Sequence, residues 1–228
     1  PGHSIHDVWI EDGIAYSSNW ADGIVAVDIG AKKHKESDRS KSQFNPLLAK
    51  AGQGSPSNPV KLAEMKDPTG RNHAAFPYLN EETGQFYIIG GDENFPWGVQ
   101  ATKNKPSNPR GGYHFMNFTD PNNPREDAIY EVPEAGSHNL WIYGDILLAG
   151  NYQGGLRIVD ISGELLGDIY KQGREIAHYL SYHKDGRIPN APMVWGAQPY
   201  KDYIFFSDMN SGLYCVAYED EQKTASAE

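Results

Sequence analysis

The segment HDVWIEDGIAYSSNWADGIVAVDIG at residues 6–30 decides the fold, because the chain repeats it. The segment HNLWIYGDILLAGNYQGGLRIVDIS at residues 138–162 aligns with it without a gap, at an offset of 132 residues. The alignment pairs His6 with His138 at the start of each segment and Val-Asp-Ile with Val-Asp-Ile near the end. A repeat of this length predicts that one structural unit recurs along the chain.

Two further copies occupy the rest of the sequence. A middle copy matches the later one at an offset of 65 residues, which pairs His73 with His138. The segment VWGAQPYKDYIFFSDMNSGLYCVAY at residues 194–218 matches at an offset of 57 residues, and it has Trp195 where the others have histidine. The chain therefore contains four copies of one unit.

Each copy has the pattern of short strands separated by turns. Segments such as VWIED and IAYSS alternate apolar with polar residues or are rich in β-branched and aromatic residues, which is typical of strands. Asp12-Gly13 and Asp22-Gly23 are hairpin signals. Four antiparallel strands in each repeat of roughly 40 to 50 residues indicate an all-β protein with the fold of a β-propeller.

We expect a single propeller domain over residues 1–220 and a polar tail over residues 221–228. The fourth blade is incomplete, because only three strands are recognisable in it. In the third blade, REIAHYL is compatible with a short helix. The predicted blades span residues 6–65, 73–132, 138–180 and 194–218.

The number of blades raises the question of how the ring closes. Propellers typically have roughly four to eight blades, so four blades with one incomplete lie at the lower limit. The residues before His6 are too few to supply the strand that the fourth blade lacks. We therefore expect missing blades to come from upstream sequence or from another chain.

Composition and charge exclude several classes of protein. The 228 residues carry a formal net charge of −10, which disfavours binding to phosphate backbones and hence to nucleic acids. No apolar run approaches the roughly 18 residues that a membrane-spanning helix needs. The N-terminal residues lack the charged and apolar regions of a signal peptide, so the chain has the pattern of a processed piece.

The motifs GIVAVDI, GLRIVDIS and the DPNNP that follows Thr119 resemble the LVIVD-repeat family of β-propellers. The resemblance covers nearly the whole chain, residues 6–218, and this chain is similar to the C-terminal part of an exported bacterial protein. It implies the propeller fold and an extracytoplasmic location, in the periplasm or at the cell surface. It implies no catalytic residues.

The repeated histidines His6, His73 and His138 are the candidate metal ligands. Propeller symmetry would place them on one ring around the axis, where three neutral imidazoles can bind a transition metal. The alternative is that each histidine forms hydrogen bonds within or between blades and braces a turn, and the repetition favours this alternative because a brace is needed once per blade. Trp195 in the fourth copy also weakens the metal interpretation.

Two loops differ between the copies and are the candidate partner-binding segments. The first combines carboxylates with aromatic rings at Asp92, Glu93, Phe95 and Trp97, and exposed aromatic residues in long loops often anchor partners. Phe95 and Trp97 can instead fold back onto their own blade. The second loop forms a basic patch on an acidic protein, and it includes Lys32, Lys33 and Lys35. It is either a solvated loop or a docking element for an acidic partner or lipid headgroups, and the first is the commoner role of such a segment.

The expected function is that of a non-catalytic extracytoplasmic scaffold. No nucleophile, zinc-protease, phosphate-loop or dinucleotide motif is present, so we assign no catalytic residue and no cofactor. The expected partners are other protein subunits of a larger assembly, with peripheral association to a membrane as an option. The alternatives are a metal-dependent propeller enzyme with an axial histidine site and a module that binds a small ligand or a sugar.

Overall fold

A computed structural model describes residues 4–34, 44–98 and 107–218 of the chain. Among these residues, strands form all the regular structure apart from a single 3₁₀ turn at Pro46–Ala49. The described part contains no helix that is long and apolar enough to cross a membrane. The all-β prediction is confirmed.

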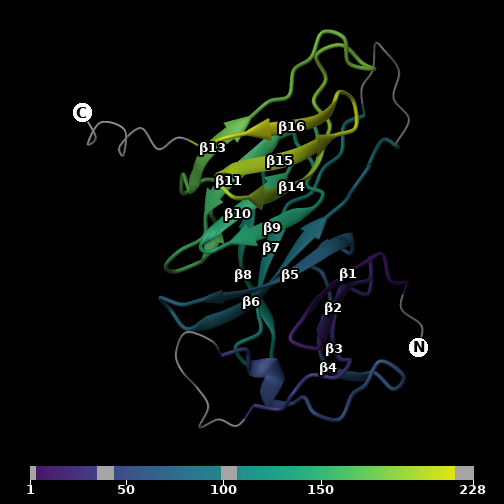
Figure 1. Cartoon of the computed structure of the whole chain (residues 1–228), viewed down its shortest axis with the longest axis vertical. Helices are drawn as coiled ribbons and strands as arrows, with labels where there is room; N and C mark the ends of the chain where they lie inside the picture. The colour runs from purple at the N-terminus through teal and green to yellow at the C-terminus, as the bar shows by residue number, and fades with distance from the viewer. Residues whose placement is uncertain (1–3, 35–43, 99–106, 219–228) are drawn as a thin grey trace.

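Four antiparallel sheets form the four blades of a β-propeller, as the repeats predict (Figure 1). The last sheet has only three strands, which confirms that the fourth blade is incomplete. Blade 1 consists of β1 (Asp7–Glu11), β2 (Ile14–Ser18), β3 (Ile24–Asp28) and β4 (Val60–Met65), and blade 2 of β5 (Asn72–Asn80), β6 (Gln85–Asp92), β7 (Tyr113–Asn117) and β8 (Arg125–Tyr130). Blade 3 consists of β9 (Leu140–Tyr143), β10 (Ile146–Gly150), β11 (Leu156–Asp160) and β13 (Glu175–Tyr179). Blade 4 consists of β14 (Val194–Tyr200), β15 (Tyr203–Asp208) and β16 (Gly212–Val216).

Two details differ from the sequence prediction. The segment REIAHYL is not a helix, because β13 pairs antiparallel with β11 and provides the outer strand of blade 3. The chain between β11 and β13 also adds β12 (Gly167–Asp168), which pairs parallel with β8 and gives blade 2 a fifth strand. This parallel strand ties blade 3 to the outer edge of blade 2.

The predicted hairpin signals form the turns between strands. Asp12 and Gly13, between β1 and β2, both have positive φ angles, of 50° and 76°. A two-residue hairpin needs this conformation, and Asp-Gly adopts it at low cost. Gly23 and Gly155 occupy equivalent turns in blades 1 and 3, with φ angles of 77° and 79°. The repeat in sequence is thus a repeat of turn geometry.

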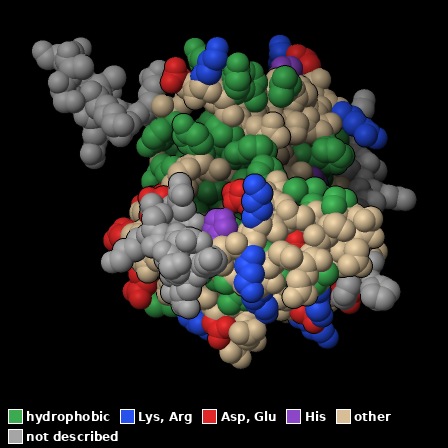
Figure 2. All heavy atoms as spheres, turned by 60° about the horizontal axis from the view of Figure 1, so that its bottom comes forward, with side chains coloured by type: hydrophobic (Ala, Val, Ile, Leu, Met, Phe, Trp, Pro, Cys, Tyr) green, Lys and Arg blue, Asp and Glu red, His purple; other side chains and the backbone are tan. Residues whose placement is uncertain are grey.

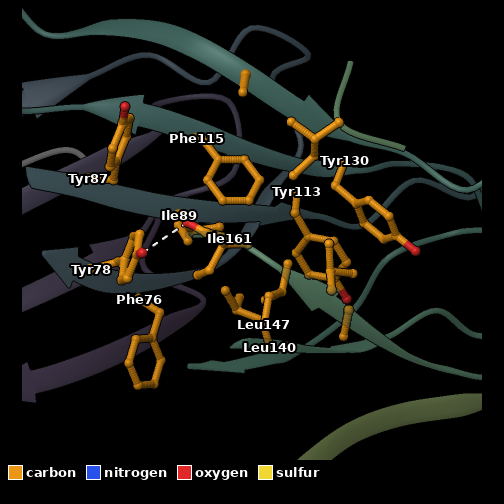
Figure 3. Packing of buried hydrophobic residues seen from close by; sticks show 14 of the residues in the cluster. Phe76, Tyr78, Tyr87, Ile89, Tyr113, Phe115, Tyr130, Leu140, Leu147 and Ile161 are labelled. Carbon is orange, nitrogen blue, oxygen red and sulfur yellow. Dashed lines mark hydrogen bonds between the residues drawn. The ribbon is translucent and has the colours of Figure 1, made fainter. Parts of the chain in front are cut away.

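The blades follow one another around an arc, and apolar side chains fill the space between neighbouring sheets. The innermost strands make contact in chain order, β1 with β5, β5 with β9, and β9 with β14. The largest core cluster joins blades 2 and 3, where Tyr87, Tyr113 and Phe115 are fully buried (Figure 3). The Tyr78 hydroxyl crosses this interface and donates to the Ile161 carbonyl at 2.9 Å, the dashed line of Figure 3.

Candidate functional site

An apolar groove of about 440 Å³ runs along the axis of the arc. The innermost strands of all four blades line it, together with side chains of β15 and β16. Three aromatic rings pack in its wall: the centroid of Trp9 lies 4.1 Å from that of Phe76 and 5.0 Å from that of Trp141. Figure 2 shows a band of hydrophobic side chains across the middle of the face that it displays. The groove is therefore an apolar surface shared by all four blades.

The three repeated histidines lie in a row at one end of the groove, with their rings tilted by 42° and 47° to one another. The ring centroid of His73 lies 4.0 Å from that of His6 and 4.1 Å from that of His138. The residues that follow them, Asp7, Ala74 and Asn139, line the groove. The structure thus brings together side chains that are more than sixty residues apart in sequence, as the repeat predicts. We call His6, His73 and His138 the histidine row.

Backbone irregularities help to orient the row. The pairing of β5 with β6 shifts register around His73, and that of β14 with β15 shifts around Trp195 at the equivalent position. Such bulges turn a side chain out of the regular alternation of a strand. The indole of Trp195 continues the row, stacked on His138 at 5.2 Å with an angle of 4° between the ring planes.

Two members of the row are anchored to the next blade through one ring nitrogen. Nδ1 of His6 donates to the backbone carbonyl of His73 at 3.2 Å, and Nδ1 of His138 donates to that of Trp195 at 2.9 Å. A carbonyl oxygen only accepts, so Nδ1 carries the proton in both rings. These bonds are the braces between blades that the repetition suggests. A neutral ring held in this way keeps the lone pair on Nε2.

Glu93 brings a carboxylate to the row. Its Oε2 lies 3.8 Å from Nε2 of His73, and its Oε1 lies 3.7 Å from Nε2 of His138. The hydroxyl of Tyr152, from the neighbouring blade, donates a short hydrogen bond to Oε1. Phe95 packs edge-on against the same tyrosine ring at 5.5 Å. The loop after β6 is thus attached to blade 3 through Tyr152.

Burial keeps the inner histidines neutral. His73 is 3% exposed, and burial together with the neighbouring histidines lowers its pKa to about 3. Burial likewise lowers the pKa of His138 to about 4, against the opposing effect of its bond to Trp195. His6 is exposed at the outer end of the row. Near neutral pH the row therefore presents two buried, uncharged imidazoles and one accessible one.

A second polar cluster lies inside blade 2 and was not expected from the sequence. His114 is buried in β7, with Nε2 3.0 Å from Asp92 Oδ2 and Nδ1 2.5 Å from Glu126 Oε1. Thr69 bridges Asp92 to Asp67 through its hydroxyl, at 2.8 and 2.6 Å. Burial lowers the pKa of His114, but the two carboxylates outweigh this effect and raise it to about 9. The cluster holds a charged imidazolium between two acids.

The structure assigns different places to the loop residues that the sequence singled out as partner-binding. Asp92 is 1% exposed and bonded to His114, so its carboxylate does not face solvent, contrary to the expectation. Glu93 faces the histidine row instead. Trp97 remains 66% exposed, with the guanidinium of Arg110 5.3 Å above its ring.

The basic segment lies at the other end of blade 1. Lys32 lines a cavity of about 930 Å³ between the turns of blades 1 and 2, together with His34 and the carboxylates of Glu11 and Glu81. Lys33 is exposed beside it. Lys35 lies outside the described residues, as does the polar tail at 221–228. The described lysines therefore face a surface that also carries acidic groups.

Comparisons with known proteins identify the fold alone. No family model and no curated protein matches the sequence. The crystal structure of the computationally designed Ika4 protein is similar with a TM-score of 0.54 and 10% identity, over 96% of this chain and 94% of that one. The crystal structure of the computationally designed Ika8 protein is similar with a TM-score of 0.52 and 11% identity, over 94% of this chain and 46% of that one. This chain thus spans just under half the length of Ika8.

Proposed function

We propose that the chain is a non-catalytic, extracytoplasmic propeller module of the LVIVD-repeat type, which binds further propeller blades across its axial groove. The observation that carries the proposal is the open groove. Its walls come from all four blades, yet among the described elements β14 and β1 make no contact comparable to those between successive inner strands. The location and the family rest on the resemblance of the repeats.

The two ends of the arc expose apolar side chains of the kind that a neighbouring sheet covers. On β1, Val8 is 46% exposed and Ile10 is 58% exposed. Across the groove, Leu213 on β16 is 75% exposed. Contiguous exposed apolar surface of this kind marks interaction sites, because leaving it in water costs free energy. Val8 and Leu213 both line the groove, so one partner can cover both.

The exposed edge of blade 4 is also evidence for a partner of this kind. Within the described residues, β16 pairs only with β15, so its other edge presents unpaired backbone groups. An exposed strand edge is a template for another strand. A β-sheet partner satisfies both features at once, because it brings a strand for the edge and an apolar face for the groove.

Photo-crosslinking in the native host tests this proposal. A photoreactive residue is placed at Leu213 on the groove, and a matched one at Leu166, which is 52% exposed but does not line the groove. We expect adducts at position 213 in which mass spectrometry identifies peptides from propeller blades. A mass of twice the chain would identify a second copy, and a larger or different mass another subunit. Equal labelling at both positions would overturn the proposal.

A further inference from the structure

We propose that His6, His73 and Glu93 bind one divalent transition-metal ion beside the axial groove. This site goes beyond the docking function proposed above and does not depend on it. The proposal rests on the positions of the nitrogen and oxygen atoms, on the tautomer that the backbone imposes on His6, and on the burial of the His73 ring next to a carboxylate.

The spacing of the atoms suits a coordination sphere better than a set of hydrogen bonds. One ring nitrogen of His6, one of His73 and one oxygen of Glu93 lie within 4.8 Å of one another. The distances of 3.7 and 3.8 Å from Glu93 to His138 and His73 exceed the roughly 3.2 Å limit of a hydrogen bond. Two ligands at about 2.0–2.1 Å from a tetrahedral metal stand about 3.3–3.4 Å apart. For His73 and Glu93, a contraction of about 0.4–0.5 Å therefore reaches the separation of two ligands on one metal.

The backbone prepares the imidazole of His6 for metal binding. Because Nδ1 of His6 donates to the His73 carbonyl, the lone pair of the neutral ring lies on Nε2. Metal-bound histidines usually have this arrangement, in which a bond from the second nitrogen sets the tautomer and the ring orientation. The hydroxyl of Tyr152 orients Glu93 in the same way.

His73 supplies an independent indication. Its Nδ1 is buried and has no hydrogen-bond partner, although its ring is almost entirely removed from solvent. A buried polar atom without a partner costs free energy, so hydrogen bonding through Nδ1 does not explain why this ring is buried in the row. The brace between blades does not explain His73, since only the Nδ1 atoms of its two neighbours are bonded to the next blade. The brace between blades also leaves unexplained why the Glu93 carboxylate faces the histidine row.

The ligand set indicates the class of metal. Neutral imidazoles with one carboxylate suit zinc, iron, nickel or copper, whereas calcium and magnesium prefer sites made of oxygen ligands. The exposed His6 marks the accessible side of the site, and the residue after each histidine lines the groove. A metal held here therefore lies beside the residues that line the groove.

Metal titration of the purified chain, stripped with a chelator, tests the site. We expect isothermal titration to give one Zn²⁺ per chain with a dissociation constant at or below about the micromolar range. Zinc should also raise the melting temperature, since a ligand that binds only the folded state stabilises it. Co²⁺ in place of Zn²⁺ should give a visible spectrum without the thiolate band that binding to Cys215 would produce.

The decisive variants are Glu93→Gln and His73→Ala, with His178→Ala as the control at an exposed histidine outside the row. Glu93→Gln preserves size, and we expect it to weaken zinc binding at least tenfold, as His73→Ala should also do. His178→Ala should bind as the wild type does. If His73→Ala fails to fold, Glu93→Gln alone decides the matter. Absence of saturable binding, or unchanged affinity in Glu93→Gln, overturns the proposal.

Discussion

At the scale of single residues, the Asp28 carboxylate is the most heavily used acceptor of blade 1. It is fully buried and accepts five backbone N–H groups, which come from Gly30 and Ala31 and from the segment 52–54. Although burial alone would raise the pKa of Asp28, these bonds hold it well below its usual range. One side chain thereby holds together the two described ends of the segment between β3 and β4.

Replacing Asp28 by Ala should destabilise the protein by about 3 kcal/mol or more, because several buried amides lose their partner. The matched control is Asp160→Ala at the equivalent position of blade 3, where, within the described residues, the carboxylate accepts hydrogen bonds from the amide and the hydroxyl of Ser162 alone. We expect a loss of about 1 kcal/mol there. Urea denaturation of the two variants measures the difference. Equal losses would contradict this account of Asp28.

His114 makes the stability of the protein depend on pH in the alkaline range. Its pKa rises from 6.5 to about 9 on folding, because the hydrogen bonds and charges of Asp92 and Glu126 outweigh the effect of burial. The folded state thus binds a proton that the unfolded state releases. The resulting stabilisation is complete below pH 6.5 and is lost as the pH rises through 9.

We expect the free energy of unfolding to fall by roughly 2–3 kcal/mol between pH 6 and pH 10 on account of this residue. His114→Gln should remove that slope while lowering stability at neutral pH. Chemical denaturation over the pH series provides the measurement, with His178→Gln as the control. A His114→Gln variant that keeps the full slope would assign the dependence to other groups.

At the scale of elements, the turns define the blades. Gly23 and Gly155 have left-handed backbones, and a Cβ atom at either would overlap the backbone oxygen of the outer strand of its own blade, at Met65 or Tyr179. Gly84, in the turn between β5 and β6, has a similar φ angle of 70° but open space around it. The first two glycines therefore serve close packing as well as turn geometry.

Substitution of these glycines by Ala should separate the two effects. Gly84→Ala should cost about 1 kcal/mol, from the backbone conformation alone. Gly23→Ala and Gly155→Ala should each cost about 2–4 kcal/mol, since steric overlap adds to that strain. Thermal denaturation of the three variants tests the order. If Gly84→Ala were as damaging as the other two, packing against the outer strand would not be the cause.

At the scale of the whole molecule, resistance to local opening should decrease from the middle of the arc toward blade 4. Strands β6 and β7 of blade 2 are almost entirely buried, whereas β16 is mostly exposed and lies at an edge. Local opening is easiest where few apolar contacts and exposed backbone bonds hold an element. We therefore expect the amides of β15 and β16 to exchange with solvent faster than those of β6 and β7.

Hydrogen exchange followed by mass spectrometry measures this gradient. The amides of β2, in a four-stranded blade at the other end of the arc, provide the control and should exchange slowly, because every residue of β2 is buried. Partner binding across the groove should slow exchange in β16 selectively. Uniform exchange across the blades would contradict the gradient and the interpretation of blade 4 as the open end.

Much of this fold could be predicted from the residues alone, because its determinants are local. Asp12-Gly13 and Gly23 specify turns through their own φ preferences, and alternating apolar residues between the turns specify strands. Since each unit recurs, the same local information appears four times, and the histidine row follows from the repeat. The strand β13 was missed because its segment is ambiguous by itself and becomes a strand only by pairing with β11.

Only the tertiary structure decided the contacts between segments that share no sequence pattern. Glu93 meets the histidine row because Tyr152 attaches its loop to the next blade, and no periodicity in the sequence encodes that attachment. Asp92 and His114 lie in neighbouring strands of one sheet, but their pairing depends on register and on side chains turned inward together. Local propensity determines which strands form; the packing of one blade on the next determines which polar groups meet.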